Sequence, residues 1–258
     1  SSRRRLLIET GLRLGLARNE YSLRYQPIWN AKTHGIVGVE ALLRWNSAEL
    51  GPVEPDEFVP VAEEVGLIRP IGFWVLREAC RQGTVWRDAG YAPIRMCVNV
   101  SPHQLLSKQF VERVRSILEE TGFEPAMLDL ELTERGMLDA ESRATATLAD
   151  LERLGVRISI DDFGMGYSSL RYLKTVKAHT IKIDRYFVNE VPDDAYSIAV
   201  AESIISLAHS IGVRVVAEGV ETLAQCNLLQ FLDCDELQGF YLARPLPAQE
   251  LAHLLERV

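Results

Sequence analysis

The stretch Ile158-Ser159-Ile160-Asp161-Asp162-Phe163-Gly164-Met165-Gly166-Tyr167-Ser168-Ser169-Leu170 decides how the rest of the chain is interpreted. It opens as a strand, because apolar and polar residues alternate over residues 156–160. A regular strand points neighbouring side chains to opposite faces, so Asp161 and Asp162 can serve one site only if the strand breaks there. The two glycines after them supply that freedom. Adjacent carboxylates repel each other unless a proton or cation lies between them, so we expect the pair to bridge divalent cations.

Length and composition place the chain among globular proteins and exclude several classes. It has 258 residues, of which 47% are hydrophobic and 25% charged, with a net charge of −8. This acidic balance argues against binding of a DNA or RNA polymer, which needs a basic face. No apolar run approaches the ~20 residues that span a bilayer, so we expect no membrane segment in this chain.

The cysteines indicate the cellular compartment of the protein, and the histidines indicate which kind of metal site it can form. The four cysteines lack CxxC spacing and are expected to be reduced and structural. That suits the cytoplasm, for a soluble protein or for the cytoplasmic part of a membrane-anchored one. The five histidines are scattered, which argues against a histidine-based metal site.

The first part of the chain predicts a helix followed by a hairpin. A helix is expected at residues 6–18 and strands at 21–29 and 36–45. The connection between the strands is so short that they must be antiparallel. Further on we expect a loop at 47–55, a helix capped by Asp56 that runs to about residue 65, and a helix at 71–89.

From residue 94 onward, strand and helix alternate. Strands are expected at 94–100, 127–133, 156–161, 180–184, 213–217 and 236–241, and helices at 101–121, 140–154, 168–173, 194–211, 221–231 and from 247. Such alternation predicts a parallel sheet with helices outside, and eight strands in ~250 residues fit a barrel better than an open sheet. We therefore predict an α/β fold, a modified TIM (β/α)8 barrel with an initial antiparallel hairpin. The chain does not begin with Met, so we expect it to be one domain, 1–258, of a longer protein, with 1–19 as the incoming helix.

Charged and amide side chains recur near the C-terminal ends of the predicted strands, where such barrels hold their chemistry. Any one of them could be solvated, could cap a helix, or, for Lys182 with Asp184, could form a structural ion pair. The full set is Gln26, Glu40, Arg44, Asn99, Glu131, Glu134, Asp161, Asp162, Lys182, Asp184, Glu218, Glu221 and Gln238.

Solvation, helix capping or a structural ion pair could explain any one of these side chains, but these explanations fit the whole set poorly. Five carboxylates at one rim, opposed only by Lys182 and Arg44, would repel one another strongly. Oxygen ligands suit Mg²⁺ or Mn²⁺ better than Zn²⁺. The arrangement fits two-metal phosphodiester hydrolysis, in which two ions clamp the attacking and leaving oxygens. The paired aspartates would bridge the ions, Glu40, Asn99 and Glu131 would complete the shell of one ion, Glu218 would take a proton from water, and Lys182 would hold that water or offset phosphate charge.

A family resemblance covers essentially the whole chain. The motif Glu40-Ala41-Leu42-Leu43-Arg44-Trp45 resembles the signature of the EAL-domain family, the bacterial cyclic di-GMP phosphodiesterases. The other matching motifs follow in the family's order, and the ordered set is far more specific than any single one. They are Tyr25-Gln26-Pro27-Ile28, Asn99-Val100-Ser101, Glu131-Leu132-Thr133-Glu134, Asp161-Asp162-Phe163-Gly164, Lys182-Ile183-Asp184, Ala217-Glu218-Gly219-Val220-Glu221-Thr222 and Gln238-Gly239-Phe240.

The resemblance implies Mg²⁺- or Mn²⁺-dependent cleavage of cyclic di-GMP to a linear dinucleotide, with two ions per site. It implies Glu40, Asn99, Glu131 and Asp161 as ligands of one metal, Asp161 and Asp162 as ligands of the other, Glu218 as general base and Lys182 beside the catalytic water. It further implies Gln26, Leu42, Arg44, Asp184 and Gln238 at the substrate, and Glu134 and Glu221 as loop-stabilising residues. A homodimer and fusion to diguanylate-cyclase-like or sensory domains are also implied.

Two departures and two alternative functions remain. Met165 stands where the family usually has a small residue, and the His-Pro pair common after Trp45 is missing. The first alternative is a cyclic di-GMP binding or receptor module of the same fold that does not cleave its ligand. The second is an unrelated metal-dependent barrel of the enolase kind. All the implied metal ligands and the base are present, which favours the phosphodiesterase.

Overall fold

The computed structural model describes residues 2–134, 141–165, 173 and 176–257. The helix predicted at 168–173 therefore lies almost wholly outside the described residues. The strands are β1 (Tyr21–Asn30), β2 (Ile36–Ser47), β3 (Gly51–Val53), β4 (Arg95–Asn99), β5 (Leu128–Thr133), β6 (Arg157–Phe163), β7 (Thr180–Ile183), β8 (Arg214–Ala217) and β9 (Glu236–Leu237).

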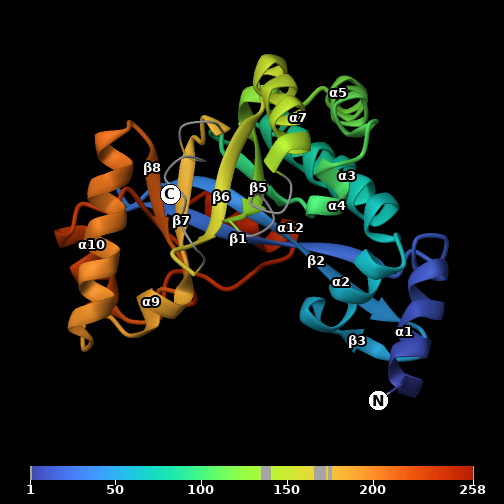
Figure 1. Cartoon of the computed structure of the whole chain (residues 1–258), viewed down its shortest axis with the longest axis horizontal. Coiled ribbons are helices and arrows are strands. Elements are labelled where there is room, and N and C mark those ends of the chain that lie inside the picture. Colours follow the sequence, from blue (N-terminus) through green and yellow to red (C-terminus); the bar gives the residue numbers. More distant parts are fainter. Residues whose placement is uncertain (1, 135–140, 166–172, 174–175, 258) are drawn as a thin grey trace.

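Helices occupy most of the chain between these strands. They are α1 (Ser2–Gly15), α2 (Pro55–Glu64), α3 (Ile68–Asp88), α4 (Pro102–Leu105), α5 (Phe110–Thr121), the 3₁₀ turn η1 (Pro125–Met127), α7 (Glu141–Leu154), α9 (Arg185–Asn189), α10 (Ala195–Ser210), α11 (Leu223–Phe231) and α12 (Ala248–Leu255). Figure 1 shows α3, α5 and α7 on one side of the strands and α10 on the opposite side. Among the described residues, no helix combines the length and the apolar character needed to cross a membrane.

The strands close into a barrel. Their order is β1-β9-β8-β7-β6-β5-β4-β2-β3, and β1 also pairs with β2, which joins the two ends of the series. Strand β1 is antiparallel to both of its neighbours, whereas the pairs from β2 and β4 around to β8 and β9 are parallel. The predicted modified TIM barrel with an initial antiparallel hairpin is confirmed.

Several local predictions differ from the structure. The expected loop at 47–55 contains β3, which extends β2 outside the ring. The N-cap of α2 is Glu54, so the prediction that Asp56 caps this helix is wrong. Strand β9 has two residues because the chain turns away after Leu237. The short helix α9 begins directly after Asp184, whose side chain accepts a hydrogen bond from the backbone N–H of Tyr186 (2.7 Å).

Helix α1 packs against the barrel rather than standing apart from it. Ile8 and Leu12 are buried in the main core. Gly11 allows a close approach, since a Cβ there would lie 2.8 Å from the indole of Trp45 on β2. The Trp45 N–H donates to the carboxylate of Glu20, just before β1. The N-terminal helix therefore supports the strand that carries Glu40.

The inside of the barrel is layered. Along each strand, every second residue points inward, so Cys97 and Val216 lie one layer below Asn99 and Glu218. Together with Ile28 they form a small apolar cluster separate from the main core. One layer lower, at the N-terminal ends of the parallel strands, the guanidinium of Arg95 donates twice to Glu236. This buried ion pair closes the base of the barrel, and the catalytic candidates occupy the opposite rim.

Candidate active site

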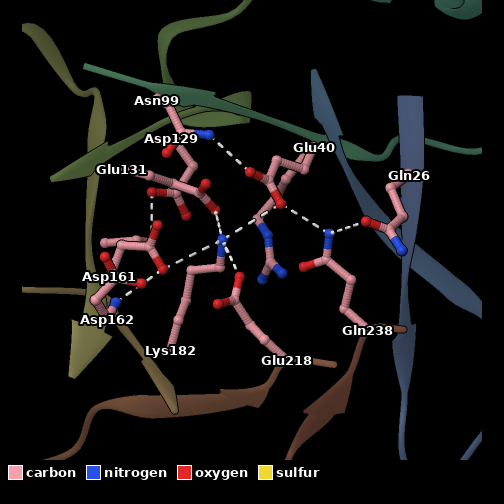
Figure 2. A network of polar contacts seen from close by, with 12 residues as sticks. Gln26, Glu40, Asn99, Asp129, Glu131, Asp161, Asp162, Lys182, Glu218 and Gln238 are labelled. Carbon is pink, nitrogen blue, oxygen red and sulfur yellow. Dashed lines mark hydrogen bonds and ion pairs between the residues drawn. The ribbon is translucent and has the colours of Figure 1, made fainter. Parts of the chain in front are cut away.

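Lys182 is the centre of the rim. Its ammonium group lies 2.6 Å from Glu218, 2.8 Å from Glu131, 3.4 Å from Glu40 and 3.7 Å from Asp161. These acids come from four different strands or strand ends, and Figure 2 shows their side chains converging on the Lys182 nitrogen. The lysine side chain is 1% exposed, so water screens these contacts little. The structure thus brings together residues that the sequence predicted to meet.

Glu40 is held on both of its oxygens. The amide of Asn99 donates to Oε1 (2.7 Å), and the amide of Gln238 donates to Oε2 (2.8 Å). Gln238 also donates to the side-chain oxygen of Gln26 (3.2 Å), whose own NH₂ donates to the carbonyl of Ala243 (3.2 Å). Glu40 is therefore fixed in orientation from three directions when Lys182 is included.

The two aspartates are arranged by a bulge in β6. The strand does not end at Asp161, as the sequence predicted, but continues to Phe163 with a register shift between Ile160 and Phe163. Asp162 itself takes a left-handed backbone conformation, with φ of 54°. The backbone N–H of Asp162 donates to the Asp161 carboxylate (2.9 Å). The break that turns both side chains toward one site is thus made by Asp162, before the glycines that were expected to supply it.

Burial and mutual repulsion disturb the protonation of these acids. Burial, together with the neighbouring acids, raises the pKa of Glu131 and of Glu218 well above the usual range, although Lys182 opposes the shift. Burial and the Asp161 charge raise the pKa of Asp162 to about 7. For Glu40, burial works to raise the pKa, but Lys182 and the hydrogen bonds from Gln238 and Asn99 lower it overall. The nearby acids raise the pKa of Lys182 despite its burial.

The side chains present fit divalent cations. Oxygens of Asp161, Asp162 and Glu218 lie within 4.8 Å of one another. Glu131 Oε2 is buried and has no hydrogen-bond partner among the described residues. When ionised, the five carboxylates leave four negative charges that Lys182 does not balance. Carboxylate and amide oxygens that face one point are ligands that Mg²⁺ and Mn²⁺ accept.

A cleft of ≈ 1070 Å³ opens above the acids. Asn99, Glu131, Asp161 and Asp162 contribute to its floor. Leu42 and Arg44, both predicted at the substrate, line it as well, together with an apolar wall from α2 and α3. The shape joins a charged floor to an apolar wall, which suits a ligand with both phosphate groups and flat rings.

Several lining residues were not predicted from the sequence, and Glu63 is one that carries a charge. Glu63 on α2 accepts a hydrogen bond from the hydroxyl of Ser101 (2.6 Å), which is also the N-cap of α4. Ser101 stands in a quoted motif, but Glu63 lies in an ordinary acidic helix turn. No feature of the sequence could have singled out Glu63.

The remaining predicted residues lie around the cluster. Glu134 accepts a hydrogen bond from the backbone N–H of Gly164 (3.2 Å), which links the end of β5 to the segment after Asp162. Asp184 caps α9 and also influences the pKa of Asp162 through a hydrogen bond. Glu221 is exposed, and its backbone N–H donates to Gln225 (2.7 Å). The roles of Glu134, Asp184 and Glu221 in function stay predictions.

Gly239 fixes the position of Gln238, and Gly239→Ala is expected to destabilise the protein by about 3 kcal/mol. A Cβ at this position would lie 2.1 Å from the carbonyl oxygen and 2.2 Å from the nitrogen of Val220. The Val220 backbone cannot yield easily, because its N–H donates to Gln238 (3.0 Å) and its carbonyl accepts from Tyr241 (3.0 Å). Urea denaturation would measure the loss.

Gly35→Ala is the matched control for that experiment. At Gly35 the closest neighbour of a Cβ is the Thr33 hydroxyl at 3.6 Å, an ordinary contact. We expect the free energy of unfolding of this variant to lie within about 0.5 kcal/mol of that of the unchanged protein. Equal urea midpoints of unfolding for Gly239→Ala and Gly35→Ala would contradict the close approach of Gly239 to Val220.

Comparison with known proteins gives consistent matches over nearly the whole chain. A model of the EAL domain family matches residues 10–245. The "Bifunctional diguanylate cyclase/cyclic di-GMP phosphodiesterase MucR" of Pseudomonas aeruginosa is 45% identical over 240 residues, which cover 93% of this chain and 35% of MucR. The chain spans about a third of the length of the first curated relatives that it matches.

Solved structures agree with the sequence matches. The structure described as "PaMucR Phosphodiesterase, c-di-GMP complex" superimposes with a TM-score of 0.91 at 44% identity, covering 95% of this chain and 99% of that chain. The EAL enzyme Bd1971, in its cAMP and cyclic-di-GMP bound form, gives a TM-score of 0.92 at 34% identity, covering 99% of this chain and 70% of that chain. The chain is therefore similar to both in sequence and in fold.

Proposed function

The chain belongs to the EAL domain family, and from that premise we propose that it is a metal-dependent phosphodiesterase that hydrolyses cyclic di-GMP to the linear dinucleotide pGpG. The observation that carries the proposal is the convergence of Glu40, Glu131, Asp161 and Glu218 on Lys182. MucR, at 45% identity, is named as a bifunctional diguanylate cyclase and cyclic di-GMP phosphodiesterase, and its structure is described as a complex with cyclic di-GMP. Hydrolysis would lower the level of a bacterial second messenger.

Two divalent ions, Mg²⁺ or Mn²⁺, would be held by Glu40, Asn99, Glu131, Asp161 and Asp162. Bound there, they would lower the pKa of an attacking water and offset charge on the phosphate. The protein supplies the fixed carboxylates that make such binding favourable. Glu40 is oriented by two amides, and Asp161 and Asp162 are turned to the same site by the bulge of β6.

Glu218 and Lys182 would handle protons and charge. The raised pKa of Glu218, caused by burial and nearby acids, makes its carboxylate a better proton acceptor near neutral pH than an exposed one. Lys182 stays charged, because the acids around it raise its pKa. Its ammonium therefore keeps Glu218 in place through a 2.6 Å contact and offers positive charge to the phosphate.

The cleft would hold the rest of the substrate. Its apolar wall can cover a guanine, and Leu42 and Arg44 line the same cleft. The Arg44 side chain is half-buried, with one of its nitrogens donating to the Leu43 carbonyl (2.9 Å). The guanidinium is thus placed along the cleft wall, where it could pair with a phosphate or a guanine edge.

The decisive experiment pairs turnover with binding. Incubation with cyclic di-GMP and Mg²⁺ or Mn²⁺ is expected to yield pGpG, detected by chromatography. Calorimetry with Ca²⁺ in place of these ions would measure binding of the intact ligand. Tight binding in Ca²⁺ with no product in Mg²⁺ or Mn²⁺ would replace the phosphodiesterase with the receptor module, the second candidate for this fold.

Divalent ions are also expected to raise the melting temperature, and more at pH 8 than at pH 5.5. Asp162, Glu131 and Glu218 have raised pKa values in the folded protein. Each contributes stability below the pKa of the unfolded chain and loses it as pH rises through the folded value, about 7 for Asp162. Glu40 has a lowered pKa in the folded protein. It therefore contributes stability at higher pH, and this contribution is lost as the pH falls through its folded value.

Because the ions bind deprotonated carboxylates, they restore this loss. When the ion concentration is a hundred times the dissociation constant, binding adds about 2.7 kcal/mol to the free energy of unfolding. This raises the melting temperature by roughly 5–10 °C for a domain of this size. Differential scanning fluorimetry with and without Mn²⁺, at matched ionic strength, measures the shift. A shift of equal size at both pH values would contradict the role given to these acids.

The assembly proposed for the chain is a homodimer of one EAL domain per subunit, each attached to cyclase-like or sensory domains. The fraction of MucR that this chain matches, 35%, supports a larger parent protein. All four cysteines are free and buried, which fits a reducing compartment such as the cytoplasm. Light scattering at several concentrations tests the dimer.

A further inference from the structure

Helix α2 carries part of the cleft wall on one face and core residues on another. The residues that line the cleft recur at helical spacing, and they are Asp56, Val59, Pro60 and Glu63. The core face includes Phe58, which is fully buried and packs edge-to-face on Trp45 with ring centroids 5.5 Å apart. The shape of the cleft therefore depends on where this helix lies.

The position of α2 depends on its contacts with the rest of the protein. An isolated helix of ten residues is marginal in water, and Pro60 removes one backbone hydrogen bond inside it. On the α1 side, α2 is held by ion pairs of Arg4 with Glu57 and of Arg5 with Glu64. These side chains are largely exposed, and exposed ion pairs contribute little to stability. A stronger contact is needed to fix the face of α2 that lines the cleft.

Glu63 makes such a contact at the C-terminal end of α2, with the turn that follows Asn99. The Ser101 hydroxyl donates to Glu63 Oε1 at 2.6 Å, whereas the Nδ1 of His103 is 3.5 Å away. The single hydroxyl proton therefore goes to Glu63. Hydrogen bonds to a carboxylate are stronger than those between neutral groups. The bond joins the α2 wall to a residue two positions after a predicted metal ligand.

Ser101 is a fixed point for this bond. It is the N-cap of α4, where its Oγ accepts from the backbone N–H of His103 (3.3 Å) and its own N–H donates to Gln104 Oε1 (3.1 Å). Gln104 in turn packs against α3 so closely that a Cβ at Gly72 would overlap its side-chain amide. The turn is thus set against α3 by packing and is joined to α2 by the Glu63 carboxylate.

Asn99 is held independently of Glu63. It lies opposite Glu131 in the β4–β5 register, and its amide donates to Glu40 (2.7 Å). Loss of the Glu63 hydrogen bond is therefore expected to shift the α2 wall and to leave the predicted metal ligands in place.

We propose that Glu63 is a positioning residue, which sets the α2 wall relative to the acids through its hydrogen bond to Ser101. The inference rests on the proposed function in that cyclic di-GMP contacts both this wall and the acids. The wall would contact the ligand equally in the ground state and in the transition state. Its displacement should therefore weaken binding without slowing the chemical step.

The test measures the affinity for cyclic di-GMP in Ca²⁺ by calorimetry. Glu63→Met keeps the length of the side chain and removes the acceptor, so it is expected to weaken binding about 10-fold. KM should rise to the same extent, with kcat within about 3-fold and Mn²⁺ affinity unchanged. Glu63→Gln keeps an oxygen that can accept from Ser101 and should bind within about 3-fold of the unchanged protein.

A double-mutant cycle tests whether Glu63 acts through Ser101. Ser101→Ala should weaken binding at least as much as Glu63→Met, and Ser101→Thr, which keeps the hydroxyl, should retain it. The double variant should bind no more weakly than Ser101→Ala alone. Losses that multiply in the double variant would overturn the inference. If Glu63→Met fails to fold, Ser101→Ala and Ser101→Thr provide the same comparison.

A measurement without ligand separates positioning from direct contact. In the free protein, hydrogen exchange in α2 is expected to be faster in Glu63→Met and in Ser101→Ala, and normal in Glu63→Gln, because a helix without this bond opens more often. Weaker binding of Glu63→Met with normal exchange in α2 would make Glu63 a ligand contact and overturn the inference. Lower Mn²⁺ affinity in Glu63→Met would also overturn it, because the segment around Asn99 would then have moved.

Glu256→Met is the matched control. Glu256, at the end of α12, also accepts a hydrogen bond from a hydroxyl, that of Tyr91 (3.0 Å). Neither residue is among the described residues that line the cleft. We expect unchanged affinity for cyclic di-GMP and unchanged exchange in α2. A loss of affinity equal to that of Glu63→Met would show that the effect is unspecific and would overturn the inference.

The outcomes distinguish this inference from the proposed function. If the unchanged protein binds cyclic di-GMP in Ca²⁺ but yields no pGpG in Mn²⁺, hydrolysis is refuted, while the affinity and exchange measurements still decide the role of Glu63. If pGpG is produced and Glu63→Met matches the unchanged protein in affinity and exchange, the positioning role alone is refuted.

Discussion

Glu40→Ala is expected to abolish hydrolysis of cyclic di-GMP while the barrel stays folded. Glu40 is a buried acid oriented by Asn99, Gln238 and Lys182, and no other described side chain replaces its two oxygens there. Loss of outer partners of a metal ligand costs about 10–100-fold, so loss of the ligand itself should cost at least about 100-fold in kcat/KM. Steady-state assays at several Mn²⁺ concentrations would measure it.

The fold should tolerate this change, because the variant removes one of several mutually repelling charges. The amides of Asn99 and Gln238 lose an acceptor, which opposes that gain. Glu40→Gln, which keeps the volume, separates loss of charge from loss of packing. Glu49→Ala, at an exposed acid beyond the same strand, is the surface control and should keep full activity. Unchanged turnover in Glu40→Ala would refute the assignment of Glu40 as a metal ligand.

Glu218→Gln is expected to bind substrate normally and to lose about 10²–10⁴-fold in kcat, the usual contribution of a general base. The amide has the same shape and can still accept the hydrogen bond from Lys182, but it cannot take a proton from water. Binding of cyclic di-GMP in Ca²⁺, measured by calorimetry, should stay within a few-fold of the unchanged protein. Rapid-quench assays in Mn²⁺ would give the rate of the chemical step.

Glu202→Gln offers the same chemical change on the exposed face of α10 and should alter neither quantity. If Glu218→Gln instead lost affinity and kept its rate per bound complex, Glu218 would be a ligand or substrate contact and not the base. A parallel loss of both would point to damage in the Lys182 cluster, which the melting temperature would report.

Periodic parts of the fold were predictable from the sequence, because local pattern determines them. The alternation of strands and helices after residue 94, and the short turn that forces the β1–β2 hairpin, correspond to confirmed elements. The length of a strand was harder to predict than its existence. Strand β9 was expected to reach Tyr241, but it stops at Leu237 because Gly239 crosses the backbone of Val220. That contact is tertiary and leaves no periodic trace.

Short helices and caps depend on single side chains. Asp184 was interpreted as a strand residue facing the site, whereas it caps α9. An Asp followed by three or four helix-compatible residues is a recognisable start signal, so this element could have been found. Strand β3 has three residues and pairs only with β2, too short a stretch to show alternation.

The acids of the site could be predicted as a group, because parallel strands bring their C-terminal ends to one rim. Their individual contacts could not. Lys182 was expected to oppose the acids in general, and the structure places it within 4 Å of four of them. The hydrogen bonds of Gln26 to Ala243 and to Gln238 join residues more than 200 positions apart. Only the closed ring brings them into contact.

The closure of the ring by β1 has a consequence for biosynthesis. Strand β1 pairs through Trp29 and Asn30 with β9, and Gln26 bonds to Ala243, 217 positions later. At roughly 5–20 residues per second, a ribosome exposes one edge of β1 for about 10–40 s before its partner emerges. An unpaired edge invites pairing with other nascent chains, and the charged Arg24 and the Pro27 within β1 discourage such pairing. Of the strands of this barrel, the first to be synthesised is thus the last to gain both of its neighbours.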